Sequence, residues 1–328
     1  MRLQVIISNQ TNPYLNVAVE NFLVSQLSPD TITLYLWKNH RTVVIGQNQN
    51  PFTECNVELL TADGGFLMRR RTGGGAVYHD GGNLNFSFIV PASFYDQQRQ
   101  FGVLMSAVAS YGLHCEVSGR NDVLCEGRKF SGNAFSRGKY NNLHHGTILI
   151  DGNVEDMRRY LKVKSSKLSR HGVASVQSRV VNLAELAPVT AQNIVAPLVS
   201  AFEKEYHAAA VVTPFDGIAT LPEVKALADD FASDEWLYAR WRSFEGRRRG
   251  SFSWGEVEVD YTIDESSRSF SNIQISTDSL LVDLSDQISR LLEGASTLEP
   301  PSLPTTADDD MQQSMSDVIA LLYDSRCS

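Results

Sequence analysis

A run of three glycines beside three arginines is the part of the sequence best suited to hold an anion. Gly73–Gly75 follow Arg69–Arg71, with only Thr72 between them. Glycines let the backbone come close to a ligand and turn several N–H groups toward it, and guanidinium groups match carboxylate or phosphate oxygens. Strand-like apolar runs at 65–68 and 76–78 frame the loop. The pattern therefore favours an anion-binding loop over the alternative, a flexible surface loop.

Two common nucleotide-binding loops are excluded at this place. The chain has no Gly-x-x-x-x-Gly-Lys-Ser/Thr sequence, so the glycines do not form a P-loop. Tyr78 stands where the dinucleotide fingerprint needs a glycine, so that motif is absent as well. A nucleotide bound here would be held by a different kind of loop.

Lys129 is the second residue suited to chemistry. It opens a segment of apolar and small residues, Phe130-Ser131-Gly132, although the turn-like Glu126-Gly127 leaves a solvated lysine at a hairpin end as the alternative. Asp122 with Asn83 offers oxygen ligands for Mg²⁺, which takes one or two oxygens from protein and the rest from phosphate and water. For Asp122, an Asx turn at the start of a strand is the alternative.

Hydrophobic periodicity predicts the elements that must position these residues. Apolar residues alternate in strands and recur every three to four residues in helices. The predicted strands come in runs with irregularly placed helices, which indicates an α+β fold with mixed, largely antiparallel sheets. The strands are expected near residues 1–8, 31–37, 42–45, 83–90, 114–118, 122–126 and 147–150, and the helices near 15–23, 101–108, 154–161, 194–202, 279–292 and 311–323.

A domain boundary is expected near Gly246–Gly250. The arginine run 247–249 between glycines is polar and turn-prone, and an alternating strand pattern resumes at Phe252–Tyr261. We therefore expect a catalytic domain at 1–245 and a small α/β domain at 250–328, whose proline-rich and acidic segment 300–310 is a solvated loop.

Composition narrows the class of protein. The chain has 328 residues and a formal net charge of -9, which is unsuited to coating nucleic acid. Its four cysteines show no metal or redox spacing, which favours reduced thiols in a reducing compartment. No signal-peptide layout or membrane-spanning run is present. We expect a cytoplasmic enzyme without nucleic-acid or membrane partners.

The segment Arg69–Asn83 resembles the lipoate–protein ligase A family. The family pattern is Arg-Arg, two residues, Gly-Gly-Gly, one residue, Val, one residue, His-Asp, one residue, Gly-Asn, and every fixed place is filled here. Lys129 matches the family's essential lysine, which stands in a Lys-x-Ser-Gly setting shortly after an Asn-Asp. The resemblance implies a biotin/lipoate ligase-like large domain, and the tail resembles the family's small C-terminal domain.

The resemblance also implies a reaction. Lipoate and ATP would give lipoyl-AMP and pyrophosphate with Mg²⁺ as cofactor, and a lysine of an acceptor would then take the lipoyl group. The acceptors would be apo lipoyl domains of 2-oxoacid dehydrogenase complexes or the glycine-cleavage H protein, as in lipoate salvage. Lys129 would contact both the carboxylate and the α-phosphate, which lowers their repulsion and stabilises the transition state.

The implied sites share the glycine loop and the lysine. ATP and the adenylate would be bound by Arg70, Gly75, Ala76, Val77, Tyr78, Asn83, Asp122 and Lys129, and lipoate by Val19, Val44, Arg70, Gly73, Gly74, Gly75, His79, Lys129 and His145. Tyr78 is a further candidate for the slot of the lipoyl chain. For the two valines a place in the ordinary core is the alternative, and for the two histidines a hydrogen-bonded structural role.

Three other functions compete with the ligase. An octanoyl or lipoyl acyltransferase would use a cysteine thioester and no ATP, and Cys125 lies four positions before Lys129. Its apolar surroundings favour a buried, inert thiol. A biotin ligase would carry a Gly-Arg-Gly run, which is missing. A non-catalytic acyl-adenylate binder would retain lipoyl-AMP without transferring it.

Overall fold

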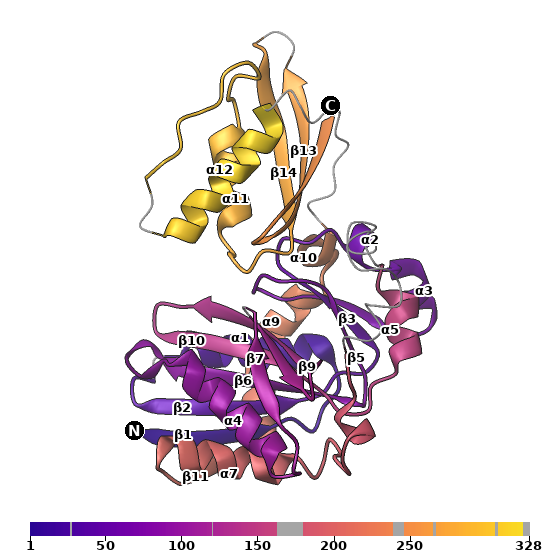
Figure 1. Cartoon of the computed structure of the whole chain (residues 1–328), viewed down its shortest axis with the longest axis vertical. Coiled ribbons are helices and arrows are strands. Elements are labelled where there is room, and N and C mark those ends of the chain that lie inside the picture. The colour runs from indigo at the N-terminus through magenta and orange to yellow at the C-terminus, as the bar shows by residue number, and fades with distance from the viewer. Residues whose placement is uncertain are drawn as a thin grey trace.

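The computed structural model describes residues 1–26, 28–119, 121–162, 180–238, 246–264, 267–305 and 308–323. A large body is built from the chain up to Tyr238, and a smaller body, orange to yellow in Figure 1, begins at Gly246. The division of the chain into folding domains at 245–250 stays a prediction. None of the helices in the described ranges has the length and apolar character needed to span a bilayer.

An eight-stranded mixed sheet forms the centre of the large body, in the order β11-β1-β2-β6-β10-β9-β8-β7. β1 pairs in parallel with both of its neighbours, β11 and β2. All the other neighbouring pairs in this order, from β2–β6 to β8–β7, are antiparallel. The predicted α+β class with largely antiparallel sheets is therefore confirmed. The strands are β1 (Arg2–Ile7), β2 (Thr31–Trp37), β6 (Asn83–Pro91), β7 (Cys115–Ser118), β8 (Asp122–Cys125), β9 (Arg128–Arg137), β10 (Asn141–Leu149) and β11 (Ala210–Thr213).

The two faces of this sheet differ because successive side chains point to opposite sides. Phe86 and Phe88 of β6 belong to an apolar core with residues of α4 (Gln97–Ala109) and α7 (Val195–Tyr206). Ser87 points to the other face, where it bonds Trp37 and Glu20 of α1 (Pro13–Ser25). Helices thus cover both faces: α4 and α7 pack on the first, and α1 packs on the second, where buried polar groups lie among apolar residues such as Ile89 and Leu143.

A second, three-stranded sheet holds the ends of the glycine loop. β3 (Thr42–Ile45) pairs in parallel with β4 (Phe66–Arg69) and antiparallel with β5 (Val77–His79), and the loop joins β4 to β5. The remaining helices of the large body are α2 (Pro51–Glu54), α3 (Val57–Ala62), α5 (Val154–Tyr160), α8 (Phe215–Ala219), α9 (Pro222–Ala232) and α10 (Asp234–Tyr238), with the 3-10 turns η1 (Ala92–Phe94) and η2 (Leu183–Glu185).

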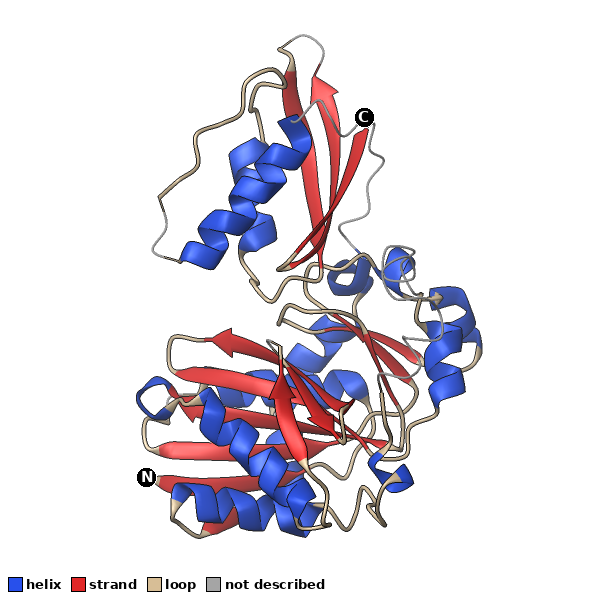
Figure 2. Cartoon of the chain, in the orientation of Figure 1, coloured by secondary structure: helices blue, strands red, loops and turns tan. Residues whose placement is uncertain are grey.

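The small body is an antiparallel sheet covered on one face by two helices (Figure 2). Its strands are β12 (Gly246–Phe252), β13 (Gly255–Asp264) and β14 (Ser269–Thr277), and its helices are α11 (Leu284–Leu292) and α12 (Asp309–Tyr323). Val259, Ile275, Ile288 and Met315 lie in the core between sheet and helices.

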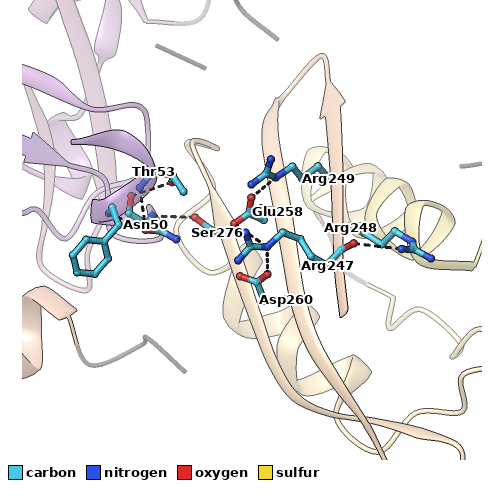
Figure 3. Close-up of polar contacts among 9 residues, drawn as sticks. Asn50, Thr53, Arg247, Arg248, Arg249, Glu258, Asp260 and Ser276 are labelled. Atoms are coloured by element: carbon cyan, nitrogen blue, oxygen red, sulfur yellow. Dashed lines mark hydrogen bonds and ion pairs between the residues drawn. The ribbon is translucent and has the colours of Figure 1, made fainter. Parts of the chain in front are cut away.

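The prediction of a turn at Gly246–Gly250 is wrong, because these are the first five of the seven residues of β12. Arg247 Nε lies 2.5 Å from Asp260 Oδ1, and Arg249 pairs with Glu258, both partners being on β13 (Figure 3). Neighbouring carboxylates neutralise the arginines, so a basic run fits an edge strand. The helix expected at 279–292 starts only at Leu284, whereas the other predicted helices match within a few residues.

Candidate active site

A cavity of about 760 Å³ lies between the large sheet, the glycine loop and the small body. β12 and β13 with their connection contribute Phe252 and Trp254, and the chain after β14 contributes Asp278 and Leu280. The large body contributes Val17, Trp37, Val44, Arg70, Gly74–Val77, His79, Asn85, Ser118, Gly119, Asn121, Asp122, Lys129, Gly132–Ala134 and His145–Thr147.

Arg70 shapes the glycine loop from within. Its guanidinium donates to the carbonyl oxygens of Gly73 (2.7 Å) and Gly75 (2.9 Å), and its Nε donates to Thr72 Oγ1 (3.0 Å). Burial lowers the pKa of Arg70 to about 10, and the nearby Glu20 opposes that shift, so the side chain is charged at neutral pH. The loop is therefore a braced structure with a positive charge beneath it.

The loop also touches the small body. Gly74, at φ +91, donates its N–H to the carbonyl of Ser279 at 2.8 Å. A Cβ added at Gly73 would lie only 2.2 Å from that same carbonyl oxygen. A second interdomain contact joins the N–H of Asn50 to Ser276 Oγ at 3.0 Å (Figure 3). Glycine at position 73 is thus required for close approach between the two bodies.

Lys129 reaches the cavity because of a β-bulge. Ser131 pairs with Val123 and Lys129 with Leu124, so Phe130 is the extra residue on β9 and lies in the core. A bulge turns a side chain to the other face, and here it brings Lys129 to the side of Gly132. A Cβ at Gly132 would lie 3.1 Å from Lys129 Nζ.

Asp122 is the partner of Lys129 in the cavity wall. Lys129 Nζ lies 2.7 Å from Asp122 Oδ1, and the side chains keep 35% and 36% of their surface exposed. Half-exposed ion pairs contribute little to stability because water screens them. The ammonium can therefore pass to an anionic ligand at small cost, and Asp122 holds it in the cavity until then.

His79 and His145 also line the cavity, and both are held by buried hydrogen bonds. His145 Nδ1 lies 2.7 Å from Glu20 Oε1, and its Nε2 lies 2.8 Å from Thr72 Oγ1. Burial, with smaller effects of Arg70 and His145, lowers the pKa of His79 to about 3. His79 is therefore a neutral imidazole at physiological pH, and it enters no proton transfer that needs a cation.

Comparisons with known proteins identify the family. The model of the lipoyl protein ligase A/B catalytic domain matches residues 12–203. A lipoate-protein ligase A of Psychrobacter cryohalolentis is 34% identical over 300 residues, which are 89% of this chain and 88% of the relative. The chain belongs to the lipoate–protein ligase A family. The predicted family and the predicted enzyme class are thereby confirmed.

Solved structures agree with membership in the lipoate–protein ligase A family. The P. falciparum LipL1 structure in complex with lipoate has a TM-score of 0.83 and 26% identity, over 97% of this chain and 99% of that one. A bi-partite lipoate protein ligase from Thermoplasma acidophilum, solved with its E2 lipoyl domain, has a TM-score of 0.64 and 24% identity, over 74% and 98%. The second likeness shows the shared fold.

Most of the residues that the ligase-family resemblance implied line the cavity together. Ten do so, from the glycine loop, from β3 and β5, and from the strands β8 to β10: Val44, Arg70, Gly74, Gly75, Ala76, Val77, His79, Asp122, Lys129 and His145. Four do not line it: Val19, Gly73, Tyr78 and Asn83.

Local geometry explains each of the four exceptions. Tyr78 alternates with its cavity-facing neighbours on β5 and packs on Tyr160, with ring centroids 5.6 Å apart. Val19 is buried in the core, and Val17 lines the cavity in its place. Gly73 abuts the small body, as described above. Asn83 turns its amide to Asn85 Oδ1 at 2.8 Å.

The predicted Mg²⁺ pair is not brought together in the cavity wall, because Asn83 does not line it. No group of three or more histidine, cysteine or carboxylate side chains in the described ranges is placed to hold a metal. Asp122 alone of the pair offers a carboxylate to the cavity. One carboxylate is sufficient for Mg²⁺ that binds together with nucleotide phosphates. The ligands present fit this kind of binding and not a metal site built from protein groups alone.

The predicted site residues left out many of the cavity's lining residues, among them Trp37, Asn85 and Thr147. These three are neighbours on adjacent strands, since Asn85 pairs with Trp37 on β2 and with Thr147 on β10. The signal was the alternation of Asn83, Asn85 and Ser87 along β6, which puts polar groups on one face of a strand whose other face is apolar.

Proposed function

We propose that the protein activates lipoate with ATP to lipoyl-AMP and transfers the lipoyl group to a lysine of a lipoyl domain. Family membership supports lipoate as the substrate. Activation with ATP and transfer are supported by a second observation: Lys129 and a glycine loop braced by Arg70 line the same cavity. Together they offer two positive charges and backbone donors to the two anions that adenylation must join.

In the first step, a carboxylate oxygen of lipoate attacks the α-phosphorus and pyrophosphate leaves. Two anions approach each other in this step, and the Lys129 ammonium between them lowers the repulsion. It also stabilises the charge that builds up on the α-phosphoryl oxygens. Removing such a donor should cost roughly 10²–10³ in rate, as removal of oxyanion-hole donors does.

In the second step, the acceptor amine attacks the acyl carbonyl carbon and AMP leaves. Lys129 donates a hydrogen bond to the carbonyl oxygen, which carries negative charge in the tetrahedral intermediate. The cavity has walls from both bodies, which would limit hydrolysis of the adenylate before the amine arrives.

Asp122 would give an oxygen ligand to Mg²⁺ bound with the nucleotide, and that ion would neutralise phosphate charge. Asn83 has a positioning role in this proposal, since its amide holds Asn85. The acceptors are lipoyl domains of 2-oxoacid dehydrogenase complexes or the glycine-cleavage H protein, and the reaction serves lipoate salvage in the cytoplasm.

The C-terminal body, proposed as the domain 250–328, acts as a cover over the adenylate. Trp254, Asp278 and Leu280 already form part of the cavity wall. A chain shortened to residues 1–245 should therefore accumulate less lipoyl-AMP and lose more of it to hydrolysis. If the shortened chain performs both half-reactions at the full-length rate, this role is wrong.

The ATP-free acyltransferase is the weaker candidate. Cys125 is buried on β8, pairs with Cys115 across the strands, and does not line the cavity. Burial raises the pKa of the Cys125 thiol, which keeps it protonated and poorly nucleophilic. A thioester at this place would have no access to a substrate in the cavity.

The test is the mass of an apo lipoyl domain incubated with the protein, lipoate, ATP and Mg²⁺. One added lipoyl group that requires ATP is expected, and Lys129→Ala should slow the addition by a factor of roughly 10²–10³. Lys225→Ala, which changes an exposed lysine of α9, should transfer at the wild-type rate. Transfer without ATP from an octanoyl-loaded carrier would instead establish the acyltransferase. Lipoyl-AMP retained without transfer would establish the non-catalytic binder.

A further inference from the structure

Four cavity residues form a row across the large sheet. Trp37, Asn85 and Thr147 are neighbours in register on β2, β6 and β10. Gly132 of β9 continues the row, because its N–H donates to Thr147 Oγ1 at 3.2 Å. Neighbouring strands are about 4.8 Å apart, so Asn85 lies about 10 Å across the sheet from Gly132 and the Lys129 ammonium beside it.

The side-chain amide of Asn85 forms a hydrogen bond through its oxygen but not through its nitrogen. Its Oδ1 accepts the hydrogen bond from Asn83 at 2.8 Å, which fixes the orientation of the group. Asn85 lines the cavity but is only 1% exposed. Its Nδ2 is buried and has no hydrogen-bond partner in the described part of the chain. A buried donor left unpaired is costly. This one lies within the cavity wall rather than open to the cavity, so an acceptor group that reached it would be stabilised.

His79 presents a second unpaired donor near the same end. Asn39 uses its Oδ1 to accept from Asn16 and therefore donates its Nδ2 to His79 Nδ1, at 3.2 Å. This leaves the proton of the neutral ring on Nε2, which is buried without a partner among the described residues. The His79 ring stands edge-on to Trp37, with centroids 6.1 Å apart. Both unpaired donors thus flank the Trp37 end of the row.

We propose that Asn85 and His79 select the ring end of the substrate, by donating to sulfur atoms of the dithiolane. The inference rests on the proposed function, since adenylation places the carboxylate at Lys129. The acyl chain then runs across the strands toward Trp37. At that end lipoate offers sulfur lone pairs, whereas octanoate, a fatty acid of the same chain length, offers only a methyl group. A methyl group leaves both donors unpaired, so the site should favour lipoate.

The test compares lipoate with octanoate in one enzyme, as the ratio of their kcat/KM values for ATP-dependent transfer. Asn85→Leu removes the donor at similar volume, and the lipoate preference should fall on the order of tenfold. Octanoate transfer should be kept or improved. Because both acids are measured on one variant, a general loss of active protein cancels in the ratio.

Asn141→Leu is the control. It removes another buried amide of the large sheet, which donates to the carbonyl oxygens of Val24 and Gln26 and does not line the cavity, so the ratio should stay at the wild-type value. Should Asn85→Leu not fold, Asn85→Ala is measured in the same way, and His79→Leu tests the second donor.

This design distinguishes failure of the inference about Asn85 and His79 from failure of the proposed function. An equal loss for both acids in the Asn85 variants would overturn the inference, because it would place the amide on the common carboxylate or give it a purely structural role. A wild-type protein that transfers neither acid with ATP would overturn the proposed function itself.

Discussion

Gly132→Ala should slow adenylation while leaving the fold intact. The new Cβ would lie 3.1 Å from both Cε and Nζ of Lys129, where ordinary contact begins near 3.4 Å. The atoms that must give way are the tip of a flexible side chain, so the fold tolerates the change. Alanine is also favoured over glycine within a strand by about 0.5–1 kcal/mol. The free energy of unfolding should therefore stay constant or rise slightly.

The expected loss of activity follows from the displacement of the ammonium. A misplacement of about 1 Å can cost about 10²-fold in rate. Moving Lys129 Nζ by a few tenths of an ångström should then lower the adenylation rate roughly four- to tenfold. Thr147 Oγ1, at 4.0 Å from the new Cβ, is not displaced.

The assay is single-turnover release of pyrophosphate, run beside chemical denaturation of the same samples. Gly217→Ala on α8 is the control, because a Cβ there meets nothing within 4 Å. Adenylation at the wild-type rate in Gly132→Ala would refute the argument that this contact positions Lys129. A parallel loss of stability and rate would refute the argument that the fold tolerates it.

Three further predictions follow from other contacts. Gly73→Ala puts a Cβ 2.2 Å from the backbone carbonyl oxygen of Ser279, which cannot move as a side-chain tip does, so the small body should separate from the loop. The radius of gyration from small-angle X-ray scattering should then increase, and an unchanged radius would count against the contact. Asp122→Asn keeps the shape but removes the charge, and should raise the Mg²⁺ concentration for half-maximal adenylation by roughly tenfold, seen in a Mg²⁺ titration. His79, with a folded pKa of about 3 against 6.5, binds fewer protons folded than unfolded, so its stabilising effect is complete above pH 6.5 and lost as pH falls toward 3. Within that window its contribution to the slope is about 1.4 kcal/mol per pH unit. Urea unfolding from pH 7 to 4.5 should show a shallower slope in His79→Gln, whereas the exposed control His207→Gln should keep the wild-type slope.

The sequence was sufficient to predict those parts of the site and fold that depend on one short segment of the chain. The glycine loop and its arginine lie within a few residues of one another, so their chemistry and family pattern are readable directly. The strands and helices with clear periodicity, such as β2 and α4, were also predicted correctly.

The remainder depends on pairings between distant segments. Strict alternation places Lys129 and Gly132, three residues apart, on opposite faces of β9, and only the bulge at Phe130 puts them on one face. The role of Asn85 follows from its register with Trp37, which lies 48 positions earlier. Arg247–Arg249 lie in a strand that pairs with β13, and the carboxylates that neutralise Arg247 and Arg249 come from β13, which lies later in the sequence.

The hydrogen bond from Gly74 to Ser279 makes the glycine loop and the small body competitors for one donor. An anion that takes the N–H of Gly74 must displace the Ser279 carbonyl, so anion binding and this interdomain bond exclude each other at that atom. Linkage is reciprocal: whatever weakens the interdomain bond strengthens the loop's hold on the anion by the same free energy. A substitution in the small body that weakens this bond should therefore increase the affinity of the loop for an anion that binds the N–H of Gly74.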